Sequence, residues 1–167
     1  MDMFSYLTII NNQKQQEISK IKKCNEYTNR YGLTLTEEQI NDIVEKRYET
    51  LKDTQRVEFG EWIIDKIIKE FCDSPYIRKD NYAETIYELI DMFYFYKNET
   101  KELVTDDELI KFMKKHFDGI CQGSLEYLSG TILEKMTDNI LKGKPLDYFI
   151  NIKSLESNEE YEDEEYE

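Results

Sequence analysis

The chain of 167 residues has little of several residue types that often mark function: one histidine, one tryptophan, two prolines and three cysteines. The three cysteines are an odd number, lie far apart and form no Cys-x-x-Cys pair, which argues against a disulfide framework and for a reducing compartment. One histidine is too few for the paired Glu-x-x-His motifs of di-iron bundles. Structural zinc sites need closely spaced ligand pairs, and this chain has none.

Basic residues are also scarce relative to acidic ones. The chain holds 22 Lys and Arg against 36 Asp and Glu, a formal net charge of −14. An acidic chain of this kind repels a phosphate backbone and an anionic bilayer, so we expect neither nucleic acid nor membrane as a partner. The start, MDMFSYLTIINNQ, lacks the basic region of a signal peptide, and no apolar run approaches membrane-spanning length. We therefore expect a cytoplasmic protein.

What the chain does have is helical periodicity. Apolar residues recur every three or four positions in six segments, and capping residues stand before several of them. The clearest are the capping box Thr36-x-x-Gln39 and the isoleucine doublets of EWIIDKIIKEFC, while Ser124 is expected to start the last helix. We predict an all-α fold, a single-domain bundle of about six helices with short connections. The scarcity of alanine and the abundance of Ile, Lys, Asn, Tyr and Glu indicate an AT-rich, bacterial genome.

Three regions differ in character along the chain. Residues 1–12 form a lead segment, residues 13–150 carry the helical pattern, and residues 151–167 form an acidic tail. The tail holds eight acids and no base between residues 154 and 167 and lacks apolar periodicity. A segment of this composition does not offset its own ordering entropy, so we predict that it is disordered.

The stretch HFDGICQGSLEYL combines the only histidine, His116, with Cys121 and Ser124. A Cys–His nucleophilic pair needs thiolate and imidazole in contact. The flanking pattern favours a corner between two helices instead. In this interpretation His116 lies in a last helical turn, Gly119 supplies a left-handed stop, and Ser124 caps the next helix.

Four carboxylates show a spacing with a known chemistry. Glu58-x-x-Glu61 and Glu88-x-x-Asp91 fit the ExxE and ExxD motifs of the all-α, MazG-like nucleotide pyrophosphatases. In that family the two motifs lie on neighbouring helices and hold Mg²⁺ against a nucleoside triphosphate, and hard carboxylate oxygens suit that ion. The competing interpretation is that Glu61 complements the dipole at the start of a helix and that Glu88 belongs to a solvated helix face. Such spacings also arise by chance in a chain rich in acids.

An aromatic run, Phe93-Tyr94-Phe95-Tyr96, spans a full helical turn. Because its members point in different directions, they cannot all enter one core. Tyrosine is favoured where one end of the ring stays wet, so Tyr94, Phe95 and Tyr96 are candidate partner contacts.

Several stretches taken together resemble an uncharacterised family of small helical proteins from Gram-positive bacteria, a domain of unknown function. The stretches are YGLTLTEEQ, RVEFG, FCDSPYI, FYFYKNE and DDELIKFMKKHFDGICQGSLEYLSGT, and the resemblance runs over roughly residues 25–135. The resemblance implies a bacterial helical domain and assigns no catalytic residue.

These observations favour a non-enzymatic protein–protein interaction module without a cofactor. The alternative is a Mg²⁺-dependent nucleotide pyrophosphatase-like hydrolase that uses Glu58, Glu61, Glu88 and Asp91. A third hypothesis is an acidic mimic that occupies a basic nucleic-acid-binding surface through the tail.

Overall fold

Helices form all the regular secondary structure in the described part of the chain, which comprises residues 2–58, 62–146 and 148 of a computed structural model. Six helical segments follow one another, so the predicted all-α bundle is confirmed. The predicted tail, residues 151–167, lies outside the described residues. Within the described ranges, no helix has the length and the apolar content needed to cross a bilayer.

The first helix is longer than its apolar pattern predicts. Helix α1 (Met3–Thr28) begins before Gln13, and the side chain of Asp2 caps it by accepting a 2.7 Å hydrogen bond from the Ser5 amide. Residues 2–9 are exposed. Because an exposed helix half has no core-facing stripe, periodicity does not reveal it.

A tight turn joins α1 to α2. One 3₁₀ turn, η1 (Asn29–Tyr31), ends at Gly32, whose left-handed backbone (φ 73°) reverses the chain. Helix α2 (Glu37–Thr54) then opens with the predicted capping box, in which the Thr36 side chain accepts from the Gln39 amide and the Gln39 side chain from the Thr36 amide. Local sequence thus determines where α2 starts.

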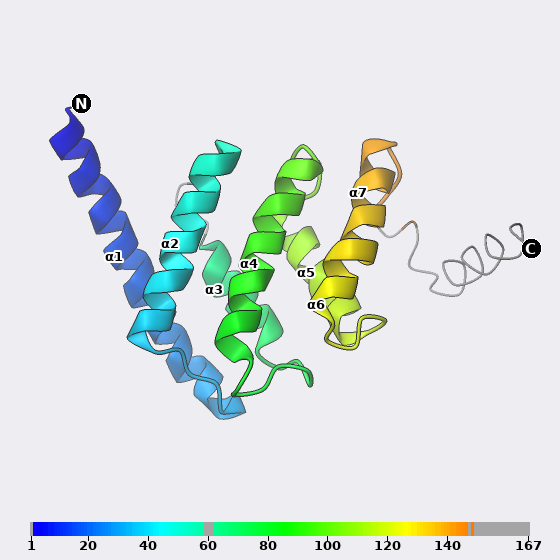
Figure 1. Cartoon of the computed structure of the whole chain (residues 1–167), viewed down its shortest axis with the longest axis horizontal. Coiled ribbons are helices and arrows are strands. Elements are labelled where there is room, and N and C mark those ends of the chain that lie inside the picture. The colour runs from blue at the N-terminus through cyan, green and yellow to red at the C-terminus, as the bar shows by residue number, and fades with distance from the viewer. Residues whose placement is uncertain (1, 59–61, 147, 149–167) are drawn as a thin grey trace, which may run out of the picture.

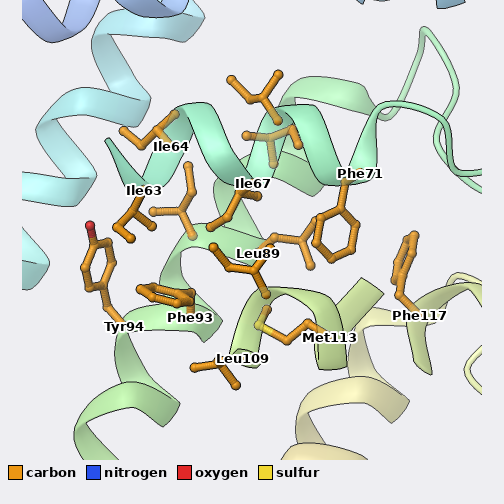
Figure 2. Close-up of a cluster of buried hydrophobic side chains, with 14 of the residues drawn as sticks. Ile63, Ile64, Ile67, Phe71, Leu89, Phe93, Tyr94, Leu109, Met113 and Phe117 are labelled. Atoms are coloured by element: carbon orange, nitrogen blue, oxygen red, sulfur yellow. The ribbon is translucent and has the colours of Figure 1, made fainter. Parts of the chain in front are cut away.

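Helix α3 (Ile63–Phe71) is short, and its apolar face is wholly buried. Its four isoleucines and Phe71 are 0% exposed. Figure 2 shows Ile63, Ile67 and Phe71 on the side of this helix that faces Leu89 and Phe93 of the fourth helix and Leu109 and Met113 of the fifth. This helix is therefore the centre of the hydrophobic core, which explains why its apolar doublets are so dense.

Three further helical segments complete the bundle. They are α4 (Tyr82–Glu99), α5 (Asp106–Asp118) and a composite segment of α6 (Leu125–Tyr127), a π-helical stretch η2 (Leu128–Leu133) and α7 (Glu134–Leu141). Thr105 caps α5, and Ser124 caps α6 by accepting from the Tyr127 amide at 3.1 Å, as predicted.

The helices form two layers. In Figure 1, α1, α2, α4 and α7 stand side by side in a front row, with α3 and α5 behind them. The contacts agree, because α2 packs against both α1 and α4, and α3 packs against α1, α4 and α5. The N-terminal half of α1 diverges from α2 and projects at one end of the row.

The corner between α5 and α6 differs from its prediction in one detail. Gly119 ends α5 with φ −91°, and the left-handed residues are Gln122 (φ 48°) and Gly123 (φ 81°). A Cβ atom at Gly123 would lie 2.5 Å from the Cβ of Tyr76, so glycine is required there by backbone and by packing. The prediction of a left-handed Gly119 was wrong, because the chain reverses later, where Tyr76 packs on it.

Candidate functional site

A buried arginine joins three separate parts of the chain. Arg47 lies in the middle of α2 and is 5% exposed. Its guanidinium donates to Oε2 of Glu17 in α1 at 2.7 Å, to Oε1 of Glu58 at 2.8 Å and to the hydroxyl of Tyr94 in α4 at 3.2 Å. Tyr94 in turn donates to Oε1 of Glu58 at 2.6 Å. We call Glu17, Arg47, Glu58 and Tyr94 the Arg47 cluster.

A second arginine extends the cluster toward α5. Arg56 donates from Nε to Oε2 of Glu58 at 3.0 Å and forms ion pairs with Glu102 and, at 3.2 Å, with Asp106. Lys97 of α4 also pairs with Asp106, at 2.9 Å. Charged side chains therefore link α1, α2, α4 and the start of α5. The side chain of Glu58 is 0% exposed. A buried carboxylate of this kind is stable only when hydrogen bonds and ion pairs offset the cost of removing it from water.

Unusual backbone conformations flank this network. Gln55 (φ 56°), Trp62 (φ 50°) and Glu102 (φ 59°) all adopt left-handed geometry without being glycine. A left-handed backbone at a residue other than glycine lowers the stability of the fold by on the order of 1 kcal/mol, and it occurs where surrounding interactions fix the chain in that conformation. Arg56, next to Gln55, is held by its amide hydrogen bond to the Leu51 carbonyl and by its ion pair with Glu58.

One atom of the cluster lacks a partner. Oε1 of Glu17 is buried and accepts no hydrogen bond from any described residue. Burial raises the pKa of Glu17 to about 7, against the opposing effect of the Arg47 charge. A buried carboxyl group with one oxygen that has no hydrogen-bond partner among the described residues is unusual and marks a candidate binding position.

Two hollows border the cluster. A partly open hollow of about 260 Å³ is lined by Gln13, Gln16, Tyr48 and Trp62 together with Glu17, Arg47 and Glu58 of the cluster. A larger open groove of about 830 Å³ separates the N-terminal half of α1 from the C-terminal half of α2. Its apolar lining residues are Tyr6, Ile9, Ile10, Tyr48, Leu51 and Val57. Hollows with an apolar lining and a few fixed polar groups are typical binding sites.

The projecting end of α1 exposes apolar side chains beside this groove. Met3 is 78% exposed and Phe4 is 80% exposed, and Tyr6, Leu7 and Ile9 are exposed as well. No residue from 3 to 13 carries a charge. We call residues 3–13 the α1 tip. Contiguous apolar surface of this kind on a folded domain is typical of an interaction site.

The four carboxylates of the alternative hypothesis occupy different environments. Glu58 is held in the Arg47 cluster, Glu88 is exposed on α4, and Asp91 pairs with Lys46 at 3.4 Å. Glu61 lies outside the described residues. Among the residues that the structure does describe, no three or more His, Cys, Asp or Glu side chains gather as a metal ion would require.

The aromatic run separates into three buried rings, those of Phe93, Tyr94 and Tyr96, and one exposed ring, that of Phe95. Tyr94 is 1% exposed, and Tyr96 is 4% exposed with its hydroxyl donating to the Ser129 carbonyl or the Glu134 carboxylate. Phe95 is 50% exposed. Of the three candidate partner contacts, only Phe95 therefore presents surface in the folded chain.

His116 and Cys121 lie in the interior of the α5–α6 corner. His116 is 4% exposed and stacks on Phe112 with ring centroids 4.4 Å apart. Burial lowers the pKa of His116 to about 4 and raises the pKa of the Cys121 thiol to about 11. Both groups are thus neutral near pH 7, so the favourable interaction of a charged His116 with the helix dipole is absent and the thiol is not activated.

Glu17 and Arg47 were not among the predicted site residues, although their positions in the sequence carry a signal. Arg47 falls on the buried stripe Ile40, Ile43, Val44, Arg47, Thr50, and Glu17 falls on the stripe Glu17, Ile21, Cys24, Thr28. One charge of each sign at a core position on neighbouring helices indicates a buried ion pair.

Comparisons with known proteins give a family and no activity. No curated protein matches the chain, and no solved structure matches it. A family model does match residues 20–145, which include all of α2 to α7 and the C-terminal third of α1. The chain belongs to the family described as a family of unknown function, DUF6323.

Proposed function

We propose that this protein is a non-enzymatic interaction module that binds an apolar helical segment of another protein in the groove between α1 and α2. The observation that carries the proposal is the concentration of exposed apolar side chains on the α1 tip, directly beside that groove. Amphipathic helices recognise grooves of this kind through side chains spaced three and four residues apart. The groove provides both an apolar wall from each helix and charged residues, Lys14, Lys52 and Glu49 among them, at its rim.

Charge supports this location over others. A chain of net charge −14 repels most acidic proteins over much of its surface, whereas the α1 tip is uncharged. An apolar partner therefore approaches most easily there. Interfaces of this type have an apolar centre from which charged residues are depleted.

Site-specific photo-crosslinking tests the proposal. Leu7 on the α1 tip is 51% exposed and Phe95 on α4 is 50% exposed, so p-benzoylphenylalanine at these two positions gives a matched pair. We expect a crosslinked protein at position 7. The identified protein is then purified, and its binding to wild type, Leu7→Glu and Phe95→Glu is measured by calorimetry.

The expected result is that Leu7→Glu weakens binding at least about tenfold, the loss typical of a central interface residue, while Phe95→Glu binds like wild type. A protein that binds Leu7→Glu as tightly as wild type contradicts the proposal. Crosslinks formed only at position 95 contradict it too and favour the aromatic run as the contact.

The alternative of a Mg²⁺-dependent nucleotide hydrolase stays a prediction. The geometry supports it less, because both oxygens of Glu58 already accept from Arg47, Arg56 and Tyr94. Hydrolysis of a panel of nucleoside triphosphates with Mg²⁺, compared between wild type and Glu88→Gln, tests it directly. Activity that disappears in Glu88→Gln would establish the alternative.

A further inference from the structure

The α1 tip carries more apolar surface than its own groove uses. One side of the tip lines the groove through Tyr6 and Ile9. Met3, Phe4 and Leu7 lie outside that lining and are 78%, 80% and 51% exposed. Because they are spaced three and four residues apart, they form one ridge along the helix. The tip is therefore both a wall of the groove and a helix with an uncovered apolar ridge of the kind that such grooves bind.

The tip and the groove also agree in length. The α1 wall of the groove runs from Tyr6 to Lys14, which is about 12 Å at the rise of an α-helix. The α1 tip, residues 3–13, is about 15 Å long by the same measure. An α1 tip can therefore fill the groove from end to end. It must come from a second copy of the chain, because a tip cannot fill a groove of which it is a wall.

The groove is balanced in charge, although the chain as a whole is strongly acidic. Its charged lining residues are three bases and three acids: Lys14, Lys52, Arg56, Glu45, Glu49 and Glu58. The α1 tip carries no charge, against a formal net charge of −14 for the chain. Two copies repel each other over much of their surfaces, but contact between a tip and a groove brings no excess of like charge together. This neutrality favours a second copy as the occupant.

The position of the tip makes a mutual exchange possible. In Figure 1, α1 forms one end of the front row, and its N-terminal half diverges from α2. A second copy can therefore reach the tip from outside the bundle. Because each copy has one tip and one groove, two copies related by a two-fold axis satisfy both at once and leave no open end.

We propose that, without another partner, two copies of this chain close each other's grooves by exchanging their α1 tips. The ridge of Met3, Phe4 and Leu7 of one copy then packs against the Leu51 and Val57 side of the other copy's groove. This inference rests on the proposed function, because it concerns the same groove. It adds a regulation of that site, since a protein partner must displace the second copy before it binds.

Sedimentation equilibrium of the purified full chain tests the proposal. The protein concentration is varied between about 1 and 200 μM, because mass action reveals a weak dimer only over a wide range. Wild type is compared with Leu7→Glu and with Phe95→Glu, which places the same charge at an equally exposed position on α4. In parallel, p-benzoylphenylalanine is placed at position 7 of the purified chain, and the crosslinked peptides are mapped by mass spectrometry.

We expect wild type to show a monomer–dimer equilibrium. Leu7→Glu should weaken the dimer at least about tenfold, since it buries a charge in both copies of the interface. Phe95→Glu should dimerise like wild type. The crosslink should join position 7 of one copy to residues 48–57 of the other. A rise in salt from about 0.1 to 0.5 M should leave the dimer equally tight or tighten it, because salt screens the repulsion between the acidic bodies.

Three results overturn the proposal: a wild type that stays monomeric over the whole range, a dimer that Leu7→Glu does not weaken, and a dimer that added salt dissociates. The last would indicate an ionic contact elsewhere on the surface. A monomeric wild type that crosslinks at position 7 to a different protein in cells excludes the second copy and leaves the proposed function standing. The expected dimer without any such protein supports the exchange of tips and contradicts the proposed function alone.

Discussion

Arg47 of α2 and Glu17 of α1 form a 2.7 Å ion pair in which the two side chains are only 6% and 3% exposed. Buried charges are costly to desolvate, and each depends on its partner to offset that cost. The pair therefore contributes less through its own attraction than through the penalty that follows when one member is removed.

Removal of the Arg47 charge should strongly destabilise the fold. Arg47→Met leaves Glu17 and Glu58 buried without their shared donor, and we expect the free energy of unfolding to fall by about 3–5 kcal/mol. Urea denaturation followed by circular dichroism measures the change. Arg78→Met is the control, since Arg78 is exposed and forms an ion pair with the exposed Asp80, and it should change stability by less than about 1 kcal/mol. Equal effects of the two substitutions would contradict the role of the cluster.

Glu17 should impose a specific pH dependence on stability. Burial raises its pKa from the usual 4.5 to about 7, so the folded chain keeps a proton that the unfolded chain releases. The contribution of Glu17 to the free energy of unfolding therefore falls as the pH rises from about 4.5 to about 7 and is constant above that. Glu17→Gln cannot titrate. The stability of wild type relative to Glu17→Gln should decrease across this interval, and a flat difference would contradict the raised pKa.

His116 should act in the opposite direction. Burial lowers its pKa from 6.5 to about 4, so the folded chain resists a proton that the unfolded chain accepts. Its contribution to stability is complete above pH 6.5 and is lost as the pH falls toward 4. As the only histidine, it gives one imidazole Hε1 resonance in a proton NMR titration. We expect a midpoint near 4, and a midpoint near 6.5 would mean that the ring is solvated.

Two glycines on either side of the Ser124 cap should respond oppositely to alanine. Gly123→Ala places a Cβ 2.5 Å from Tyr76 on a backbone with φ 81°, and we expect a loss of at least about 1–3 kcal/mol. Gly130 lies inside η2 with open space around it, so Gly130→Ala should leave stability unchanged or raise it by up to about 1 kcal/mol. Thermal unfolding of both variants checks the prediction, and a stable Gly123→Ala would show that Tyr76 moves away.

Local sequence signals predicted the helices but not the way they bury charge and aromatic rings. The Thr36–Gln39 capping box and the Ser124 cap each involve residues within four positions of one another, so they can be recognised from the sequence alone. The ion pair of Arg47 with Glu17 joins positions 30 residues apart. This ion pair exists because α1 packs against α2. The apolar periodicity of the sequence shows one charged residue in each of two apolar stripes, but it does not show that the two stripes face each other.

The aromatic run is a second case in which the sequence alone does not show which side chains are buried. Helix α4 stands inside the front row and contacts α2, α3, α5 and α6. With neighbours around most of its circumference, α4 buries Tyr94 and Tyr96 on different sides and leaves Phe95 toward solvent. A single sequence shows that the rings point in several directions, but not how many of those directions are covered.

The position of Glu17 bears on where this domain can be divided. The family match begins at residue 20, inside α1 and just beyond Glu17. A chain shortened to residues 20–145 would keep Arg47 and Glu58 in the interior and lose the acid that α1 supplies to them. The buried ion-pair network therefore extends three residues upstream of the span shared by the family.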